Sequence, residues 1–377
     1  MNEKHAQEKK YYLGRLGVLA EKFSDLFVNK LNFSQINNAL LYLYQDKIEK
    51  MKPSDLLKNY TENRLVRPSE VNQEHLCEFD LLIMRAIGAE YQKIEVSPVV
   101  PIGSSSLLTH IDSKTILQTI RSAEVIPDTS IALALESAMR RSNNKERSSL
   151  GNVNLASSQR LLRLQSFQGN KDLVPHFGSY VLSTAGRDTG NYKFEQQAAL
   201  DHISNWLNVI QTLKQQGYQM DRVKVYISNI AIIEELIARG ILNRDDLVQK
   251  TRQSGINIFE SLGIGESAKV SDLEDVPEII PGNKLLLLSK FKENYLISLT
   301  ENEGVEFVFD LSRIAGLGYY KDLCFKIKVV NPDNSETSII DGGTADWTEK
   351  LLSDSKERFF SSGIGSELVI QKYRSVK

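Results

Sequence analysis

Residues 160–195 read RLLRLQSFQGNKDLVPHFGSYVLSTAGRDTGNYKFE, a stretch in which a polar loop joins two apolar runs. The loop contains Gly169, Asn170 and Pro175, which favour turns and do not suit the interior of a strand. The stretch therefore predicts a β-hairpin, with Arg163 leaving the first run and Phe177 entering the second. In such a hairpin a cation and an aromatic ring face the same cavity.

Several ionisable residues stand among the apolar residues of this hairpin. Arg187, Asp188 and Glu195 follow the second run, and His176 precedes Phe177. Because charged side chains are rarely buried without partners, these residues are predicted to line a wet or ligand-filled site. The alternative is a surface hairpin with solvated charged rims, and the stretch alone does not separate the two.

The composition is typical of a soluble globular protein. The 377 residues are 41% hydrophobic and 25% charged, with a formal net charge of -2. A nearly neutral chain lacks the clustered Lys and Arg that bulk nucleic-acid binding needs. Cys77 and Cys324 stand far apart in apolar segments, which predicts buried reduced thiols and no metal site.

The N-terminal sequence gives no sign of export or membrane insertion. The start, MNEKHAQEKK, is charged and no apolar signal region follows it. No apolar run approaches the roughly 20 residues that a membrane-spanning helix needs. A cytoplasmic protein without membrane contact is therefore predicted.

A helical segment is predicted before the main domain. From residue 11 to about residue 50 apolar residues recur at helical spacing, for example Leu16, Leu19 and Phe23. Residues 59–70, NYTENRLVRPSE, form a polar connector. This pattern divides the chain into a helical segment, residues 1–70, and a main domain, residues 71–377.

The main domain is predicted to be α+β with an antiparallel sheet. A helix over residues 75–87 is stopped by Gly88, and a strand follows it until prolines interrupt. Later stretches are predicted as strands: KLLLLSKF, NYLISLT, VEFVFDLSR, CFKIKVV and TSIIDGG, between residues 284 and 343. Helices do not alternate one for one with them, which argues against a doubly wound parallel sheet.

Common catalytic and nucleotide-binding motifs do not occur in the sequence. Neither GxGxxG nor GxxxxGK[ST] is present, and GxSxG and HExxH are absent as well. Walker-type, Rossmann-type and hydrolase chemistry therefore have no support. His202 falls in the amphipathic helix after the hairpin, where a helix-packing role is favoured over acid–base chemistry.

The order of motifs resembles the catalytic core of class II aminoacyl-tRNA synthetases, closest to histidyl-tRNA synthetase. The resemblance runs from about residue 75 to residue 370. It rests on the helix and strand at 75–101, the Arg163–loop–Phe177 hairpin, IAGLGYYKDLCFKI (314–327), DGGTADW (341–347) and SSGIGSELVI (361–370). The double tyrosine, Tyr319 and Tyr320, is the most specific single match.

The resemblance implies roles for the matched residues. Arg163 would hold the α-phosphate of ATP and Phe177 would stack on adenine, while Gln165 stands where motif 2 has a glutamate. The resemblance thus implies ATP with Mg²⁺ as the cofactor, and no other cofactor is expected. Residues 75–101 would form the two-fold interface of a homodimer.

Departures from the family pattern argue against ordinary histidine adenylation. Leu368 stands where motif 3 has its arginine, Ala315 and Gly318 replace the arginine and aspartate of the histidine motif, and Thr344 and Ala345 replace the Arg and Tyr of Gly-Gly-Arg-Tyr-Asp. Loss of such cations typically costs about 3 kcal/mol or more each in transition-state stabilisation. About a dozen residues follow the motif 3 match, so no anticodon-binding domain and no tRNA partner are expected. The ATP phosphoribosyltransferase regulatory subunit, which senses histidine, has the same features.

Three functions remain open on the sequence. The first is a non-translating paralogue that binds an amino acid or related small ligand as a sensor or regulatory subunit, with an enzyme partner. The second is an ATP-dependent aminoacyl or acyl ligase for a non-tRNA acceptor, in which Arg121 or Arg187 replaces the lost cations. The third is a structural or assembly role.

The predicted ligand site draws on residues that are far apart in the sequence. Arg121, Glu124, Arg163, Arg187, Tyr319 and Tyr320 are predicted to line one pocket. Glu124 would take a ligand ammonium, and Arg163 with Arg187 a carboxylate or phosphate. The full set of candidate ligand-binding residues is Arg121, Glu124, Arg163, Gln165, His176, Phe177, Arg187, Asp188, Tyr319 and Tyr320.

Overall fold

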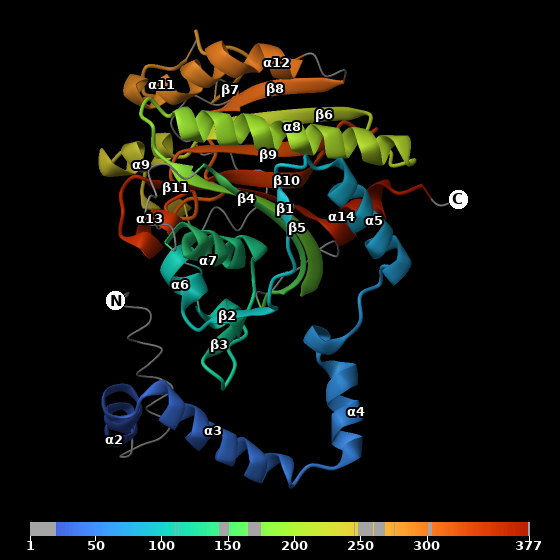
Figure 1. The fold of residues 1–377 in the computed structure, drawn as a ribbon, viewed down its shortest axis with the longest axis vertical. Helices are drawn as coiled ribbons and strands as arrows, with labels where there is room; N and C mark the ends of the chain where they lie inside the picture. Colours follow the sequence, from blue (N-terminus) through green and yellow to red (C-terminus); the bar gives the residue numbers. More distant parts are fainter. Residues whose placement is uncertain are drawn as a thin grey trace.

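A nine-stranded sheet forms the centre of the molecule (Figure 1). The computed structural model describes residues 20–109, 111, 113–142, 151–164, 175–244, 246–247, 259, 268–274, 276–300 and 304–375. The strand order is β1-β4-β5-β11-β10-β9-β6-β8-β7. The strands are β1 (Gln92–Lys93), β4 (Val153–Leu162), β5 (His176–Arg187), β6 (Arg222–Asn229), β7 (Lys269–Val270), β8 (Val305–Asp310), β9 (Leu323–Val330), β10 (Glu336–Ala345) and β11 (Glu357–Gly365).

The sheet is mainly antiparallel, as the sequence predicts. Among the strands that the structure describes, only the pairs β1–β4 and β6–β8 are parallel. A second sheet of two short strands, β2 (Val99–Pro101) and β3 (Ala123–Val125), lies beyond the β4–β5 end (Figure 1). With its helices on both faces of the sheet, the chain has the α+β architecture expected for the main domain.

The predicted hairpin is confirmed as β4 and β5, which pair antiparallel. The last register pairs are Leu161 with Phe177 and Leu162 with His176. The Arg163 amide then donates to the Pro175 carbonyl at 2.8 Å, which continues the pairing beyond the strands. This register fixes the relative positions of Arg163 and Phe177.

Helices cover both faces of the sheet. On one face, α8 (Lys193–Gln215) and α5 (Gln73–Ala86) pack on a large core that includes Trp206. On the other face, α7 (Thr129–Ser142) and α13 (Trp347–Leu352) cover the β4–β5–β11 end around Trp347. Other helices of the domain include α6 (Ser104–Thr109), η4 (Ser113–Thr115), α9 (Ala231–Ala238) and α14 (Ser366–Tyr373). No helix among the described residues combines the length and the apolar composition that crossing a membrane requires.

The strands expected over KLLLLSKF and NYLISLT are wrong, because these residues are helical. They form α11 (Gly282–Phe291), η7 (Lys292–Leu296) and α12 (Ile297–Thr300). Leu287, Leu288 and Phe291 are buried at helical spacing. A continuous apolar run has no period that separates a buried strand from a helix, and packing decided this one.

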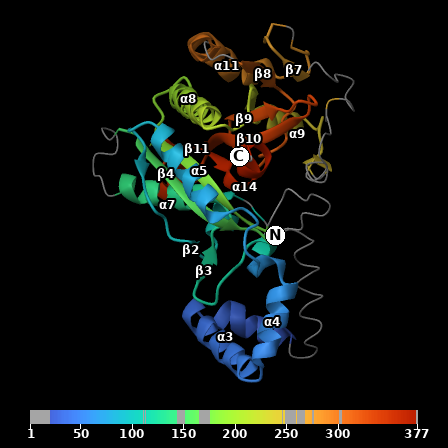
Figure 2. The same cartoon turned by 90° about the vertical axis from the view of Figure 1, so that its right-hand side faces the viewer.

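The N-terminal helices stand apart from the sheet (Figures 1 and 2). They are α2 (Ala20–Ser24), η2 (Asp25–Lys30), α3 (Phe33–Ile48), α4 (Pro53–Glu62) and η3 (Arg64–Val66). Asn32 caps α3 in a capping box with Gln35, and Pro53 starts α4 at a position that needs no amide hydrogen. The division into domains at residue 70 stays a prediction.

His202 links α8 to the middle of the sheet. Its side chain has no exposed surface, and its ring nitrogens lie 3.1 Å from the Thr184 hydroxyl and 2.7 Å from the Ser362 hydroxyl. Burial lowers the pKa of His202 to about 3 from its usual 6.5. The imidazole is therefore neutral at physiological pH, which confirms a packing role.

This lowered pKa predicts a loss of stability in mild acid. The contribution of neutral His202 is fully present above about pH 6.5 and is lost as pH falls towards the folded-state pKa, because only the unfolded chain binds the proton. The free energy of unfolding should be about 2 kcal/mol lower at pH 5 than at pH 7.5. Urea unfolding of His202→Gln should show a smaller pH slope, whereas His75→Gln, a control on α5, should keep the wild-type slope. An unchanged slope in His202→Gln would contradict the assignment.

Candidate functional site

A cavity of about 710 Å³ lies where the β4–β5 hairpin meets β10 and β11. Ser179 on β5, Asp341 on β10 and the segment 361–365 on β11 form part of its lining. Two connections complete the walls. One runs through Thr109, Pro127 and Asp128, and the other carries Arg313 and the two tyrosines, Tyr319 and Tyr320.

Arg163 and Phe177 meet in this cavity, as the hairpin pattern predicts. The guanidinium carbon of Arg163 lies 5.2 Å from the centre of the Phe177 ring, a cation–π distance. Arg163 Nε donates to the Pro127 carbonyl at 2.8 Å, and one of its terminal nitrogens lies 3.9 Å from Asp128 Oδ2. The Arg163 side chain remains 34% exposed, so it can still reach a ligand.

Tyr319 and Tyr320 form the opposite wall. The Tyr319 hydroxyl donates to Asp128 Oδ2 at 2.9 Å, and the Tyr320 hydroxyl donates to Asp341 Oδ1 at 2.8 Å. Gly316 has φ +95°, and a Cβ on it would lie 2.4 Å from the Tyr320 ring. Glycine is therefore needed at position 316 for the double tyrosine to take this position. Burial raises the pKa of both tyrosines well above its usual value, so both hydroxyls stay protonated donors.

Arg313 and Asp341 form a charged pair that the sequence reasoning missed. Arg313, buried at 7% exposure, donates to the carbonyls of Ala315 and Phe325 at 2.8 and 3.0 Å and to Asp341 Oδ1 at 2.7 Å. Lys326 Nζ lies 3.4 Å from Asp341 Oδ2. In the sequence each of these residues lies within a predicted strand stretch and is followed closely by a glycine, a pattern that does not distinguish a site residue from a strand position.

The surroundings of Asp341 keep its carboxylate ionised. Burial would raise the pKa of Asp341, but the positive charges of Arg313 and Lys326 outweigh burial and hold the pKa below its usual value. The Asp341 side chain still has 39% of its surface exposed. A fixed, ionised and accessible carboxylate is suited to an ammonium group or another cation.

The two arginines of the cavity differ in availability. Arg313 is saturated by two carbonyls and by Asp341, whereas the Pro127 carbonyl is the only hydrogen-bond acceptor of the Arg163 side chain among the described residues. Arg163 is therefore the cation of this cavity that can bind a carboxylate or phosphate.

Of the six residues predicted to share one pocket, Arg121, Glu124 and Arg187 lie outside this cavity, so that prediction is wrong for these three. Glu124 is fully buried and accepts hydrogen bonds from the amides of Gly103 and Ser105 at 2.9 and 2.7 Å, at the start of α6. Arg121 borders a separate groove beside α3. The positions of Glu124 and Arg121 both result from the short β2–β3 sheet, which directs residues 119–125 away from the main sheet.

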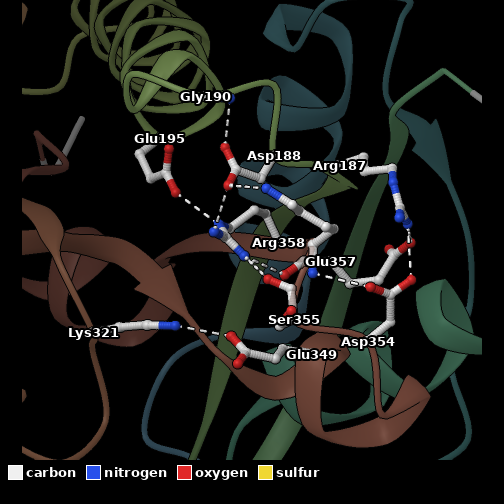
Figure 3. A network of polar contacts seen from close by, with 11 residues as sticks. Arg187, Asp188, Gly190, Glu195, Lys321, Glu349, Asp354, Ser355, Glu357 and Arg358 are labelled. Carbon is white, nitrogen blue, oxygen red and sulfur yellow. Dashed lines mark hydrogen bonds and ion pairs between the residues drawn. The ribbon is translucent and has the colours of Figure 1, made fainter. Parts of the chain in front are cut away.

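Arg187 and Asp188 belong to a polar network at the far end of β5 (Figure 3). Arg187 bonds to Asp354 at 2.8 Å and Glu357 at 3.3 Å, while Arg358 joins Asp188 and Glu195, each at 2.9 Å. The hydrogen bond from the Gly190 amide, and after it the charge of Arg358, holds the pKa of Asp188 below its usual value. These charges therefore neutralise one another, and placing them in the ligand site is corrected.

His176 and Gln165 complete the set of predicted residues. His176 Nδ1 lies 2.9 Å from an Arg160 nitrogen, and its Nε2 contacts the Arg67 carbonyl. It does not line the cavity, because it is the first residue of β5, one position before Phe177, and successive strand residues point to opposite sides of the sheet. Gln165 lies outside the described residues.

Comparisons with known proteins agree on the fold. No protein-family model and no curated protein matches the sequence. Similar solved structures include the following three. An ATP phosphoribosyltransferase regulatory subunit/histidyl-tRNA synthetase from Bacillus halodurans has a TM-score of 0.60 and 13% identity, over 83% of each chain. Histidyl-tRNA synthetase from Nostoc sp. PCC 7120 has a TM-score of 0.58 and 13% identity, over 82% of this chain and 74% of that one. The apo S. aureus histidyl-tRNA synthetase has a TM-score of 0.51 and 12% identity, over 81% of this chain and 72% of that one.

At these identities the likeness shows the fold alone. The chain has a class II synthetase-like core, which confirms the fold that the motif order predicts.

Proposed function

We propose that this chain, built on a class II synthetase-like core, is a histidyl-tRNA synthetase-like paralogue that does not charge tRNA. It binds an amino acid or related small ligand and acts as a sensor or regulatory subunit of an enzyme. One observation carries the proposal: a single cavity presents the ionised, accessible Asp341 and the available cation Arg163. A zwitterion matches this pair, with its ammonium at Asp341 and its carboxylate at Arg163.

The arrangement of cations argues against adenylation as the main activity. Arg121 and Arg187, which could have replaced the missing catalytic arginines, lie outside the cavity. Arg313 is close to the altered position Ala315, but its guanidinium already donates to two carbonyls and to Asp341 and is almost fully buried. A developing phosphate charge would therefore meet one available arginine, and catalysis of this kind needs several preorganised positive groups.

ATP with Mg²⁺ belongs to the ligase alternative. Arg163 and Phe177 are the residues that would hold its phosphate and base. In this structure the Arg163 guanidinium lies over the face of the Phe177 ring. An adenine base would need the same face of the ring for stacking. The residues present therefore fit a small zwitterion better than a nucleotide.

The regulatory role is supported by the similarity to the Bacillus halodurans protein, an ATP phosphoribosyltransferase regulatory subunit/histidyl-tRNA synthetase. A homodimer through α5 remains part of the proposal. Leu81 and Met84 on this helix are 43% and 37% exposed, although both are apolar. An apolar helix face of this kind is suited to a two-fold contact.

Calorimetric titration with the twenty amino acids and with ATP, followed by pyrophosphate exchange, tests the proposal. We expect one or a few amino acids to bind without exchange. Removing the α-amino group from the bound amino acid should weaken binding about tenfold or more, since a charge-assisted hydrogen bond to Asp341 is worth about 1.5–3 kcal/mol. Amino-acid-dependent exchange would favour the ligase instead. If none of the amino acids binds, the proposed amino-acid sensor is contradicted.

A further inference from the structure

The N-terminal helices expose an unusual amount of apolar surface. More than half of the exposed large apolar side chains in the described part of the chain lie between Phe23 and Val66. On α3, Tyr42, Leu43 and Ile48 are 72%, 58% and 61% exposed. On α4, Leu57 is 66% exposed. Scattered apolar residues are normal on a surface, but a contiguous apolar patch marks an interaction site.

Helix α3 is apolar around most of its circumference. Five consecutive residues, 40–44, are Leu-Leu-Tyr-Leu-Tyr, and they span more than one turn. A helix that is hydrophobic on all sides is normally buried. Yet neither α3 nor α4 has a buried residue in the described chain. The surface of α3 is therefore incomplete without a partner.

The helices are attached to the main domain, so their exposed faces have a fixed position. Asn37 on α3 donates to the Ser122 hydroxyl at 2.7 Å. After α4, Arg64 donates to the Leu164 carbonyl at 3.2 Å, and Ser69 to Glu367 at 3.3 Å. A groove of about 950 Å³ separates α3 from residues 119–121 and is lined by Leu41, Tyr44 and Ile48 among others.

The charges on these helices favour a second copy of the chain over an acidic or a basic partner. Residues 33–62 contain four lysines and four carboxylates: Lys47, Lys50, Lys52, Lys58, Asp46, Glu49, Asp55 and Glu62. The net charge of the surface is therefore zero, and both signs are available for a self-complementary contact. Permanent contacts between identical chains are also the more apolar class of interface.

We propose that the exposed faces of α3 and α4 bind the same helices of a second copy of this chain. This contact is separate from the one proposed for α5. Each copy would cover the apolar surface of the other, and the mixed charges around it would fix the orientation. With both contacts arranged around perpendicular, intersecting two-fold axes the protein is a tetramer, and with this contact alone it is a dimer.

Light scattering of the full chain over a range of concentrations tests the proposal. The variant carries Leu43→Asp together with Leu57→Asp, which places two charges in the contact. We expect its mass to be half that of the wild type, whatever the state of the α5 contact. Leu107→Asp on α6 is the matched control, because Leu107 is 74% exposed and lies outside the N-terminal helices. The control should keep the wild-type mass.

Both substitutions fall on exposed side chains, so circular dichroism and melting should show a folded chain in each case. An unchanged mass in the double variant would overturn the proposal. A monomeric wild type would overturn it as well, since α3 and α4 would then stay exposed or bind a different protein. Association that appears only after deletion of residues 1–19 would show that those residues cover the helices, which also contradicts a second copy.

Discussion

Replacing Arg141 by Met should lower the free energy of unfolding by about 3–5 kcal/mol, the largest stability effect expected in this protein. Arg141 and Glu357 have fully buried side chains and form a bidentate ion pair, in which Nε bonds to Oε2 and a terminal nitrogen to Oε1 at 3.1 Å. The pair joins α7 to the start of β11. Without Arg141, Glu357 would remain buried next to Arg187 alone, which is partly exposed and shared with Asp354.

Urea unfolding provides the measurement, and the neighbouring residue provides the control. Arg140 also makes an ion pair, with Glu136, but its side chain is 31% exposed, so Arg140→Met should cost at most about 1 kcal/mol. The double variant Arg141→Met with Glu357→Met should recover part of the loss, because no buried charge is then left unpaired. Equal stability of Arg140→Met and Arg141→Met would show that burial of the pair has no energetic consequence.

Replacing Arg163 by Ala should weaken binding of the amino acid identified by titration by about 100-fold or more. Two charge-assisted hydrogen bonds to a ligand carboxylate would be lost, each worth about 1.5–3 kcal/mol. The melting temperature should change by only a few degrees, because the Arg163 side chain is partly exposed and, among the described residues, hydrogen-bonds to the Pro127 carbonyl alone. Arg163→Lys should recover only part of the affinity, since lysine keeps the charge but loses the planar fork.

Arg160, on β4 three residues before Arg163, is the matched control. It bonds to the buried carboxylate of Glu367 at 2.8 Å and lies outside the cavity. Arg160→Ala should therefore lower the melting temperature while leaving ligand affinity close to that of the wild type. If Arg163→Ala instead unfolds the protein and the remaining folded fraction still binds, Arg163 is a structural residue and the proposed ligand orientation is wrong.

Local patterns in the sequence predicted those parts of the fold that depend on neighbouring residues. Turn-forming residues between Arg163 and Phe177 indicated the hairpin, and apolar spacing indicated α8. The same reasoning failed for residues 284–300, where an apolar run without a period became helical because Leu287, Leu288 and Phe291 pack against the main core. Such a choice is made by tertiary contacts rather than by the segment itself.

The candidate site was predicted in part for the same reason. Arg163, Phe177, Tyr319 and Tyr320 were found through motifs and do line one cavity. Arg313 and Asp341 were missed, because they meet only through the pairing of β9 with β10 and the loop after β8. The rule that buried charges need partners was sound for Arg187, but the sequence could not show that Asp354 and Glu357 were those partners rather than a ligand.

Because β11 lies at the centre of the sheet, the sheet can be completed during translation only after β11 has been synthesised. β11 lies between β5 and β10 and is the only strand that joins β1-β4-β5 to β10-β9-β6-β8-β7 in the described sheet. Until residues 357–365 leave the ribosome, a twelve-residue strand, β5, and a ten-residue strand, β10, have one unpaired edge each. Long unpaired edges are templates for aggregation. The nascent chain therefore depends on β11 to cover the open edges of both halves of the sheet. The ligand cavity, which β11 helps to line, forms at the same moment.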